Sequence, residues 1–189
     1  MRVTAQPDGR TPAAGALTHL DEQGRAHMVD VTAKPLTRRL AVARCAVVTT
    51  VDAVAALGRP GNRLDPVEAA RVAGIQGAKE TSSLVPLCHS IRVDHVSVDV
   101  EVSAHRIEIT AVTEVVERTG VEMEALTACA VAGLTLVCSL LDVDPEASIE
   151  ELTLWHKSGG RSGDWQRSEP SAPRHQEAAL PTLAGTAES

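Results

Sequence analysis

The feature that most constrains this fold is a long segment, residues 119–141, that has a helical pattern and is apolar on nearly all sides. Thr119 and Glu122 have the spacing of a capping box, which predicts that the helix begins at Thr119. The run ALTACAVAGLTLVCSLL continues the helix until Asp144-Pro145 ends it. A sheet can cover only one side of such a helix. We therefore expect a core helix that also reaches a subunit interface.

Four other segments have the patterns of β-strands. Residues 44–54 are rich in β-branched side chains, which favour strands. Apolar and polar side chains alternate in residues 96–102 and again in residues 107–111, as they do in half-buried strands. A turn at residues 103–105 would join these two strands. We expect a last strand at residues 149–156.

One more helix is predicted between the first two strands. Asp65 supplies an acceptor at the N-cap and Pro66 suits the first turn, so this helix begins there and is expected to reach about Ser82. The order of elements is therefore β-α-β-β-α-β. This order predicts an α+β fold of the ferredoxin-like kind, with an antiparallel sheet and both helices on one face.

The folded domain is expected to span residues 18–167. Within it, residues 18–36 have a mixed composition and are predicted to lie across the domain as an ordered arm. Residues 1–17 and 168–189 are rich in small and polar residues and lack apolar periodicity. We therefore expect disordered tails at both ends.

Composition argues against several kinds of partner. The net charge of −7 and the absence of Phe and Tyr disfavour a nucleic-acid surface, which needs clustered cations or aromatic platforms. No uninterrupted apolar run has the roughly 18 residues of a membrane span, and the first residues lack the apolar stretch of a secretory signal. The four cysteines have no CxxC spacing, which favours reduced thiols over a zinc site. We expect a cytoplasmic protein that binds no nucleic acid, membrane or metal.

The segment KSGGRSGD, residues 157–164, is suited to binding phosphate. Its glycines expose backbone N–H groups, and Lys157, Arg161 and two serines add donors. An ordinary flexible loop before a tail would have much the same composition, so the segment alone leaves both interpretations open.

Two further segments carry ionisable groups. His89, which follows Leu87 and Cys88, could transfer protons near neutral pH, although a hydrogen-bonded histidine at a strand start is an equally good interpretation. Glu122 and Glu124 lie in the first turn of the apolar helix, where the helix dipole favours carboxylates. Capping explains Glu122, whereas Glu124 needs another partner on its apolar side of the helix.

Additional cations lie near the first helix. Arg63, on the loop before this helix, could reach the phosphate site expected at residues 157–164. Arg71 and Lys79, within the helix, could add positive charge, but taken alone they are better explained as solvated side chains.

Five segments stand in a recognisable order: HMVDVTAK (27–34), ARVAGIQGAK (70–79), LVPLCH (84–89), TGVEMEALTA (119–128) and KSGGRSGD (157–164). Together they resemble the MoaC family of cyclic pyranopterin monophosphate synthases, which act in molybdenum-cofactor biosynthesis. The resemblance extends from Leu17 to about Trp165, which is nearly the whole expected domain.

The resemblance implies a ferredoxin-like subunit and a homo-oligomer, namely a hexamer built as a trimer of dimers with active sites at the dimer interface. It also implies a lyase reaction. The substrate, 3′,8-cyclo-7,8-dihydroguanosine 5′-triphosphate, is rearranged to cyclic pyranopterin monophosphate with release of pyrophosphate, and no metal or other cofactor is required. Such a reaction needs a cationic site for the triphosphate and several acid/base groups.

The resemblance also implies roles for individual residues. The catalytic candidates are His89, Glu122, Glu124, Cys138 and Lys157. The substrate-binding candidates are Leu87, Cys88, His89, Met123, Glu124, Arg63, Lys79 and Arg161. Met123 and Glu124 would contact the purine-derived part of the substrate, and Lys79, Lys157 and Arg161 would serve the phosphates or developing charge.

Three positions depart from the family pattern. The family's catalytic aspartate falls on Cys138, and a family lysine three residues later falls on Leu141. A further family lysine falls on Arg63, which keeps the charge but cannot exchange a proton in the same way. An unperturbed thiol is mostly neutral at pH 7, so Cys138 is a poor substitute for a carboxylate.

Two other functions therefore fit the same sequence. One is a diverged paralogue that binds a cyclised or related nucleotide with altered or no catalysis. The other is a non-catalytic subunit that assembles with an intact paralogue. His89, Glu124, Lys157 and the glycine-rich segment favour a phosphorylated ligand over the purely structural role.

Overall fold

The computed structural model describes residues 19–21, 23–58 and 65–168 of the chain. The predicted tails, 1–17 and 168–189, lie outside these residues except for Ser168. Arg63 also lies outside the described residues.

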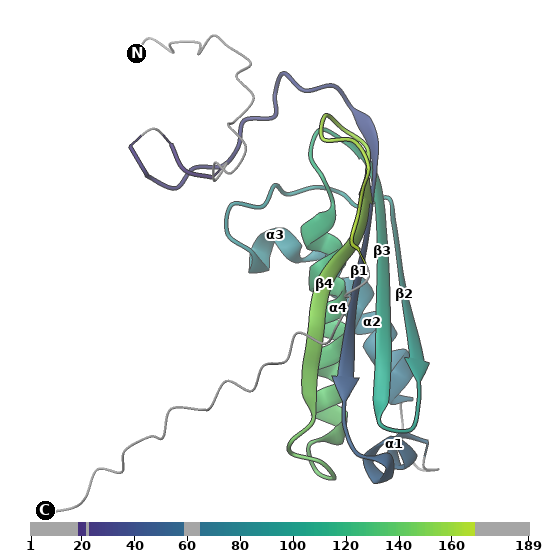
Figure 1. Ribbon diagram of the computed structural model, residues 1–189. Helices are drawn as coiled ribbons and strands as arrows, with labels where there is room; N and C mark the ends of the chain where they lie inside the picture. Colours follow the sequence, from purple (N-terminus) through teal and green to yellow (C-terminus); the bar gives the residue numbers. More distant parts are fainter. Residues whose placement is uncertain (1–18, 22, 59–64, 169–189) are drawn as a thin grey trace, which may run out of the picture.

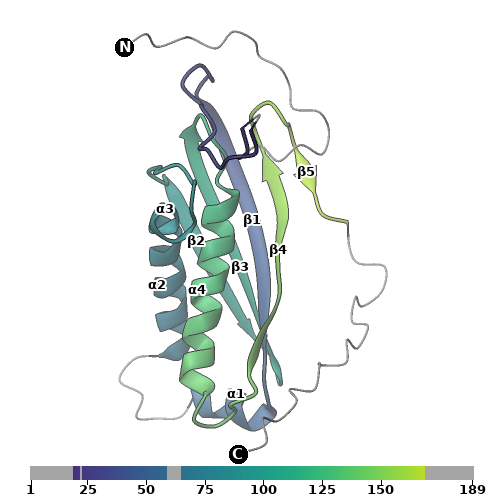
Figure 2. The ribbon, with the colours of Figure 1, turned by 90° about the vertical axis from the view of Figure 1, so that its left-hand side faces the viewer.

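An antiparallel sheet of five strands forms one layer, in the order β2-β3-β1-β4-β5. The strands are β1 (Thr37–Val48), β2 (His95–Val102), β3 (Arg106–Glu117), β4 (Ser148–Ser158) and β5 (Trp165–Gln166). The helices are α1 (Val51–Leu57), α2 (Pro66–Lys79), α3 (Thr81–Leu84) and α4 (Glu122–Leu140). Helices α2 and α4 lie side by side on one face of the sheet, with α3 and α1 towards its opposite ends (Figures 1 and 2). The predicted α+β fold, with an antiparallel sheet packed against helices, is confirmed.

The core lies between the sheet and α4, and it is built from small side chains. Alternate residues of β1, from Ala41 to Val47, face the helices and are buried. On α2, Gly74 lets α4 approach closely, because a Cβ atom there would lie 2.9 Å from the backbone oxygen of Ala128. By length and composition α4 could cross a membrane, but half of it is buried in this packing, so it is the core helix of the domain. Leu134 nevertheless remains 60% exposed on its outer side.

The first strand differs from its predicted range. It begins at Thr37 and ends at Val48, and residues 51–57 form α1 instead of continuing the strand to residue 54. The Thr50 hydroxyl accepts a hydrogen bond from the Ala53 N–H at 3.3 Å and caps the helix. Local capping therefore overrides the β-branched composition of the segment.

The expected capping box at Thr119 is wrong. Helix α4 begins at Glu122, and its N-cap residue, Val121, makes no side-chain capping bond. Thr113 of β3 instead donates a hydrogen bond to the Val121 carbonyl at 3.0 Å, which fixes the start of α4 on the sheet.

The first helix is also shorter than predicted. It ends at Lys79 rather than near Ser82, and the one-turn helix α3 follows. The short edge strand β5 has no counterpart among the predicted strands.

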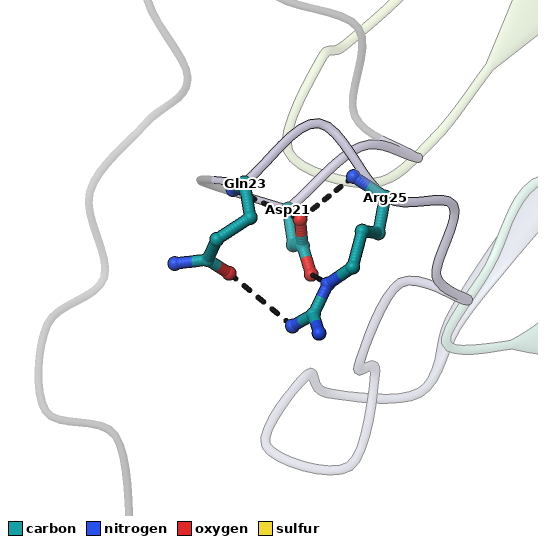
Figure 3. A network of polar contacts seen from close by, with 3 residues as sticks. All are labelled: Asp21, Gln23 and Arg25. Atoms are coloured by element: carbon teal, nitrogen blue, oxygen red, sulfur yellow. Dashed lines mark hydrogen bonds and ion pairs between the residues drawn. The ribbon is translucent and has the colours of Figure 1, made fainter.

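The arm before β1 has a local structure of its own. Asp21 accepts hydrogen bonds from the backbone N–H groups of Gln23 and Arg25, and its carboxylate pairs with the Arg25 guanidinium at 2.8 Å (Figure 3). In Figure 1 this hairpin extends from the start of β1, beyond one end of the sheet. His89 Nε2 lies 2.8 Å from the Val29 carbonyl and thereby ties the arm to the loop after α3.

Candidate functional site

The structure separates the predicted site residues into two groups, at opposite ends of α4. Glu122 and Glu124 lie in its first turn, and Cys138 and Leu141 lie at its far end. Fourteen residues separate Glu124 from Cys138, which corresponds to about 21 Å along a helix. One subunit therefore does not bring these two groups together. Cys138 and Leu141 are both exposed.

Lys157 and Glu122 form an ion pair at the first end of α4. Lys157 Nζ lies 3.1 Å from Glu122 Oε1, and both side chains are roughly one-third exposed or less. Lys157 stands opposite Ala41 in the pairing of β4 with β1, on the face that α4 covers. Gly120 leaves room for this arrangement, because a Cβ atom there would overlap the Glu122 carboxylate. The pair therefore fixes a cation and a carboxylate beside the start of the helix.

Glu124 is the buried acid of the site. Only 4% of the residue is exposed, and burial raises the pKa of its carboxyl to about 7, with a smaller contribution from the negative charge of Glu122. A carboxyl with this pKa exchanges protons near neutral pH. The sequence indicated that the Glu124 carboxylate needs explaining, and the structure shows that it is buried.

The loop Val85–His89 lies against Glu124. Leu87 has a φ angle of 64°, an uncommon conformation for a side chain other than glycine, and the Cys88 N–H donates to the Val85 carbonyl at 3.3 Å. Burial, together with the charge of Glu124, raises the pKa of the Cys88 thiol and keeps it neutral. Cys88 can therefore act here as a weak hydrogen-bond donor rather than as a thiolate.

His89 has a defined orientation. A carbonyl oxygen only accepts hydrogen bonds, so the contact between His89 Nε2 and the Val29 oxygen places a proton on Nε2. In the neutral ring, Nδ1 is then the nitrogen that can accept a proton. The same bond holds the arm against the loop, and the proton-transfer role of His89 stays a prediction.

A cationic pocket is formed in part by the glycine-rich loop that follows Lys157. It has a volume of about 480 Å³ and lies between the arm, the start of β1 and the glycine-rich loop. Its lining residues are Ala33, Lys34, Pro35, Thr37, Arg39, Gly160 and Arg161. Three of the seven are cations and none is acidic, so the pocket is suited to an anion.

The glycine-rich loop holds the Arg39 side chain in place. Gly159 and Gly160 have φ angles of 91° and 71°, and a Cβ atom on Gly160 would overlap the Arg39 guanidinium. Arg39 also donates to the Arg118 carbonyl at 3.2 Å. In the part of the chain that the structure describes, Arg39 Nε is buried without a hydrogen-bond partner, as is the Thr37 hydroxyl. A bound oxyanion could offer acceptors to such donors after a small shift.

The pocket and the acid/base groups lie on the same face of the sheet. Arg39 and Ala41 are two residues apart on β1 and so point to one face, about 7 Å apart. Ala41 stands opposite Lys157, whose amine reaches Glu122. One extended molecule could therefore contact the pocket and Lys157 together.

Sequence reasoning missed Lys34 and Arg39 as site residues. Lys34 ends the family-like segment HMVDVTAK, which was a usable signal, whereas nothing in the sequence singled out Arg39. The pairing of β1 with β4 brings Arg39 beside the glycine-rich loop.

The remaining candidates have varied positions. Lys79 is the exposed last residue of α2, and Met123 is 38% exposed in the first turn of α4. Arg71 has a structural role, because it donates to the Val98 carbonyl at 2.7 Å and pairs with Glu68. Among the described residues, no three His, Cys, Asp or Glu side chains are grouped as metal ligands.

Comparisons with known proteins identify the family of the chain. A family model described as the MoaC family matches residues 28–160. The chain is 49% identical over 155 residues to cyclic pyranopterin monophosphate synthase 2 of Mycobacterium tuberculosis (strain ATCC 25618 / H37Rv), covering 82% of this chain and 93% of that protein. It is 49% identical over 163 residues to the cyclic pyranopterin monophosphate synthase of Thermomicrobium roseum, covering 84% and 97%. The corresponding protein of Streptomyces griseus is 46% identical over 158 residues, covering 83% and 89%.

Proposed function

The chain belongs to the MoaC family, and we propose that it is a cyclic pyranopterin monophosphate synthase of molybdenum-cofactor biosynthesis. Its substrate would be the cyclised guanosine triphosphate, which is rearranged to cyclic pyranopterin monophosphate with release of pyrophosphate. The observation that carries the proposal is a cation-lined pocket on the same face of the sheet as Lys157 and its partner Glu122. A triphosphate that loses pyrophosphate needs both within reach of one molecule.

The pocket would bind the phosphates. Lys34, Arg39 and Arg161 supply positive charge where the departing pyrophosphate gains negative charge. Because Gly160 and the Arg118 carbonyl already hold the Arg39 side chain, little reorganisation is needed when the anion binds. Positive charge that is already in position stabilises the departing pyrophosphate without further rearrangement of the protein during the reaction.

Glu124 and His89 would transfer protons during the rearrangement. The pKa of Glu124, about 7, lets its carboxyl both donate and accept a proton near neutral pH. His89 would use Nδ1, because its Nε2 is directed at the Val29 carbonyl. Lys157 would stay paired with Glu122 and, with Leu87, Cys88 and Met123, complete the walls around the ring of the substrate.

The complete site would require more than one subunit. Cys138 and Leu141 occupy the positions that the resemblance assigns to an acid/base pair, and they lie at the far end of α4 from Glu124. A second copy that presented this end of its α4 to the pocket would bring the groups together. We therefore propose a homo-oligomer with the dimer as the smallest complete unit, and the hexamer that the resemblance implies. The exposed Leu134 fits such an interface.

The proposal also includes a cytoplasmic location. Cys45, Cys88, Cys129 and Cys138 are all free thiols, as is typical of proteins in reducing compartments. Lys79, at the end of α2, and Arg63 would add charge to the assembled site.

A diverged paralogue that binds the nucleotide with altered or no catalysis is the second candidate. The observation that favours it is the chemistry of Cys138 and Leu141, since neither side chain replaces a carboxylate or an amine. A non-catalytic subunit of a mixed assembly would have no use for an anion pocket beside a buried acid. Incubation with the cyclised triphosphate tests the choice. The synthase releases pyranopterin and pyrophosphate, whereas the diverged paralogue binds the compound without releasing them.

A further inference from the structure

The chain has only two aromatic side chains, Trp155 and Trp165, and they have different surroundings. The guanidinium of Arg44, on β1, lies 4.4 Å from the centre of the Trp155 ring, on β4, so the Trp155 ring already has a cation as its partner. Trp165 is 41% exposed, and it begins the short edge strand β5 directly after the glycine-rich loop. An exposed indole at this place leaves a large flat apolar surface open to a ligand.

The pairing of β5 with β4 places Trp165 at the candidate site. Trp165 stands directly opposite Lys157, and residues directly opposite each other in an antiparallel pair point to the same face of the sheet. The Lys157 amine reaches Glu122, so this face is the one that carries the acid/base groups. Figure 2 shows β5 at the edge of the sheet beside β4, next to the loop that lines the pocket.

A short stretch of chain connects the cationic pocket to Trp165. Arg161, at the tip of the β4–β5 loop, lines the cationic pocket, and Trp165 follows it four residues later. A ligand whose phosphates occupied the pocket would extend its ring system along the loop toward Trp165 and Lys157. Flat heteroaromatic rings stack on indole, and this contact tolerates changes in the ring because every such ring has a π-face.

We propose that Trp165 is the stacking platform for the bicyclic purine-type ring of the bound nucleotide. This inference rests on the proposed function, because it takes the cationic pocket to be the phosphate site. Trp165 is a binding and positioning residue in this account. It holds the ring beside Lys157 and Glu122 and does not itself exchange protons.

Fluorescence tests the stacking directly. The variant Trp155→Phe leaves Trp165 as the only tryptophan, and the chain has no tyrosine to contribute emission. GTP serves as the probe with a ring, and inorganic tripolyphosphate as the probe without one. We expect GTP to quench the Trp165 emission at saturation, and tripolyphosphate to bind without comparable quenching.

Calorimetry on the full-length chain gives a second readout. Trp165→Ala should weaken GTP binding about tenfold and leave tripolyphosphate binding unchanged, since a stacked base is worth that much. Trp165→Phe should recover most of the lost affinity, which a purely structural role of the indole nitrogen would not allow. Circular dichroism establishes that both variants are folded, and the phenylalanine variant remains informative if the alanine variant is not.

The outcomes separate this inference from the proposed function. If GTP and tripolyphosphate both bind but Trp165→Ala changes neither affinity, or weakens both equally, the stacking is refuted and the phosphate pocket stands. If neither probe binds the natural chain, the phosphate pocket and the stacking both fail. Quenching of Trp165 by tripolyphosphate to the same extent as by GTP would also overturn the stacking, because it would report movement of the loop rather than ring contact.

Discussion

Lys157 Nζ lies 3.1 Å from Glu122 Oε1, and this ion pair joins β4 to the first turn of α4 beside the cationic pocket. The pair lies where the two structural layers meet, so its loss should affect both binding and stability. Each consequence can be measured separately.

Replacing Lys157 by methionine should reduce turnover of the cyclised triphosphate by more than tenfold, because it removes a positive charge next to the reacting groups. The free energy of unfolding should fall by only about 0.2–1 kcal/mol, as is usual for a partly exposed pair. Arg38→Gln is the matched control. It breaks the ion pair with Glu114, at 2.6 Å, on the opposite face of the sheet and should leave turnover unchanged. Equal activity losses in the two variants would argue against a role for Lys157 in the site.

Glu124 should make stability depend on pH. Burial raises the pKa of its carboxyl from 4.5 to about 7, so the folded protein binds the proton more tightly than the unfolded chain does. The stabilisation is fully present below the unfolded pKa and is lost as the pH rises through 7, with a total of at most about 3 kcal/mol.

Urea unfolding of the natural chain and of Glu124→Gln checks this expectation. The natural chain should lose more stability than the variant between about pH 5 and about pH 8, because glutamine stays neutral throughout. Identical pH profiles for the two proteins would show that the Glu124 carboxyl is not the buried titrating group.

Much of the architecture was predictable because local patterns agree with it. Side chains alternate between apolar and polar in β2 and β3, and α4 is a long apolar run. These patterns indicate which faces are buried, so the two strands and the helix could be predicted. The end of β1 and the start of α4 could not be predicted, because they depend on two side-chain hydrogen bonds. The Thr50 hydroxyl accepts one from the Ala53 N–H, and the Thr113 hydroxyl donates the other to the Val121 carbonyl.

The site was only partly predictable for a similar reason. Residues within the family-like segments, such as His89 and Lys157, could be named as candidates, whereas Arg39 depends on strand pairing that the sequence does not reveal. The fourteen residues between Glu124 and Cys138 predict nearly the same side of a helix, but they also separate the two residues by about 21 Å along it. In the structure Glu124 is buried and Cys138 is exposed, so a shared helical side did not make a shared site.

Gly160 should be essential to the pocket, whereas Gly163 should not. Both have positive φ angles, so alanine costs about 1 kcal/mol of backbone strain at either position. Only at Gly160 would the new Cβ atom overlap the Arg39 guanidinium, whereas nothing lies within 4 Å at Gly163. Gly160→Ala should therefore weaken GTP binding by about tenfold, as Arg39→Gln should.

Calorimetry with GTP at low and high salt measures this difference, and the affinity of the natural chain should fall as salt rises. If Gly163→Ala weakens binding as much as Gly160→Ala, then loop strain rather than displacement of Arg39 explains the effect.

Assembly should depend on the outer side of α4. Leu134→Glu places a charge where the proposed interface needs an apolar surface, so it should convert the oligomer into a species near the 19.9 kDa of one chain. Sedimentation at micromolar concentration measures the mass of the natural chain and of the variant. A natural chain that sediments as a single subunit would refute the shared site, and Leu134→Glu would then have no effect.

Cys138 and Leu141 should limit the rate rather than the fold. The double variant Cys138→Asp with Leu141→Lys should turn over faster than the natural chain, and the two changes should depend on each other because an aspartate alone lacks its partner. A folded double variant that binds GTP but turns over no faster would mean that the pocket has diverged beyond this pair.

The most direct measurement of the central claim is the conversion of the cyclised triphosphate by the natural full-length chain. Pyrophosphate and cyclic pyranopterin monophosphate should appear in equal amounts, and the yield should fall when Arg39 is replaced by glutamine in the pocket. A natural chain that binds the cyclised triphosphate and releases neither product, under conditions where the double variant releases both, would contradict the synthase account and establish the binding paralogue in its place.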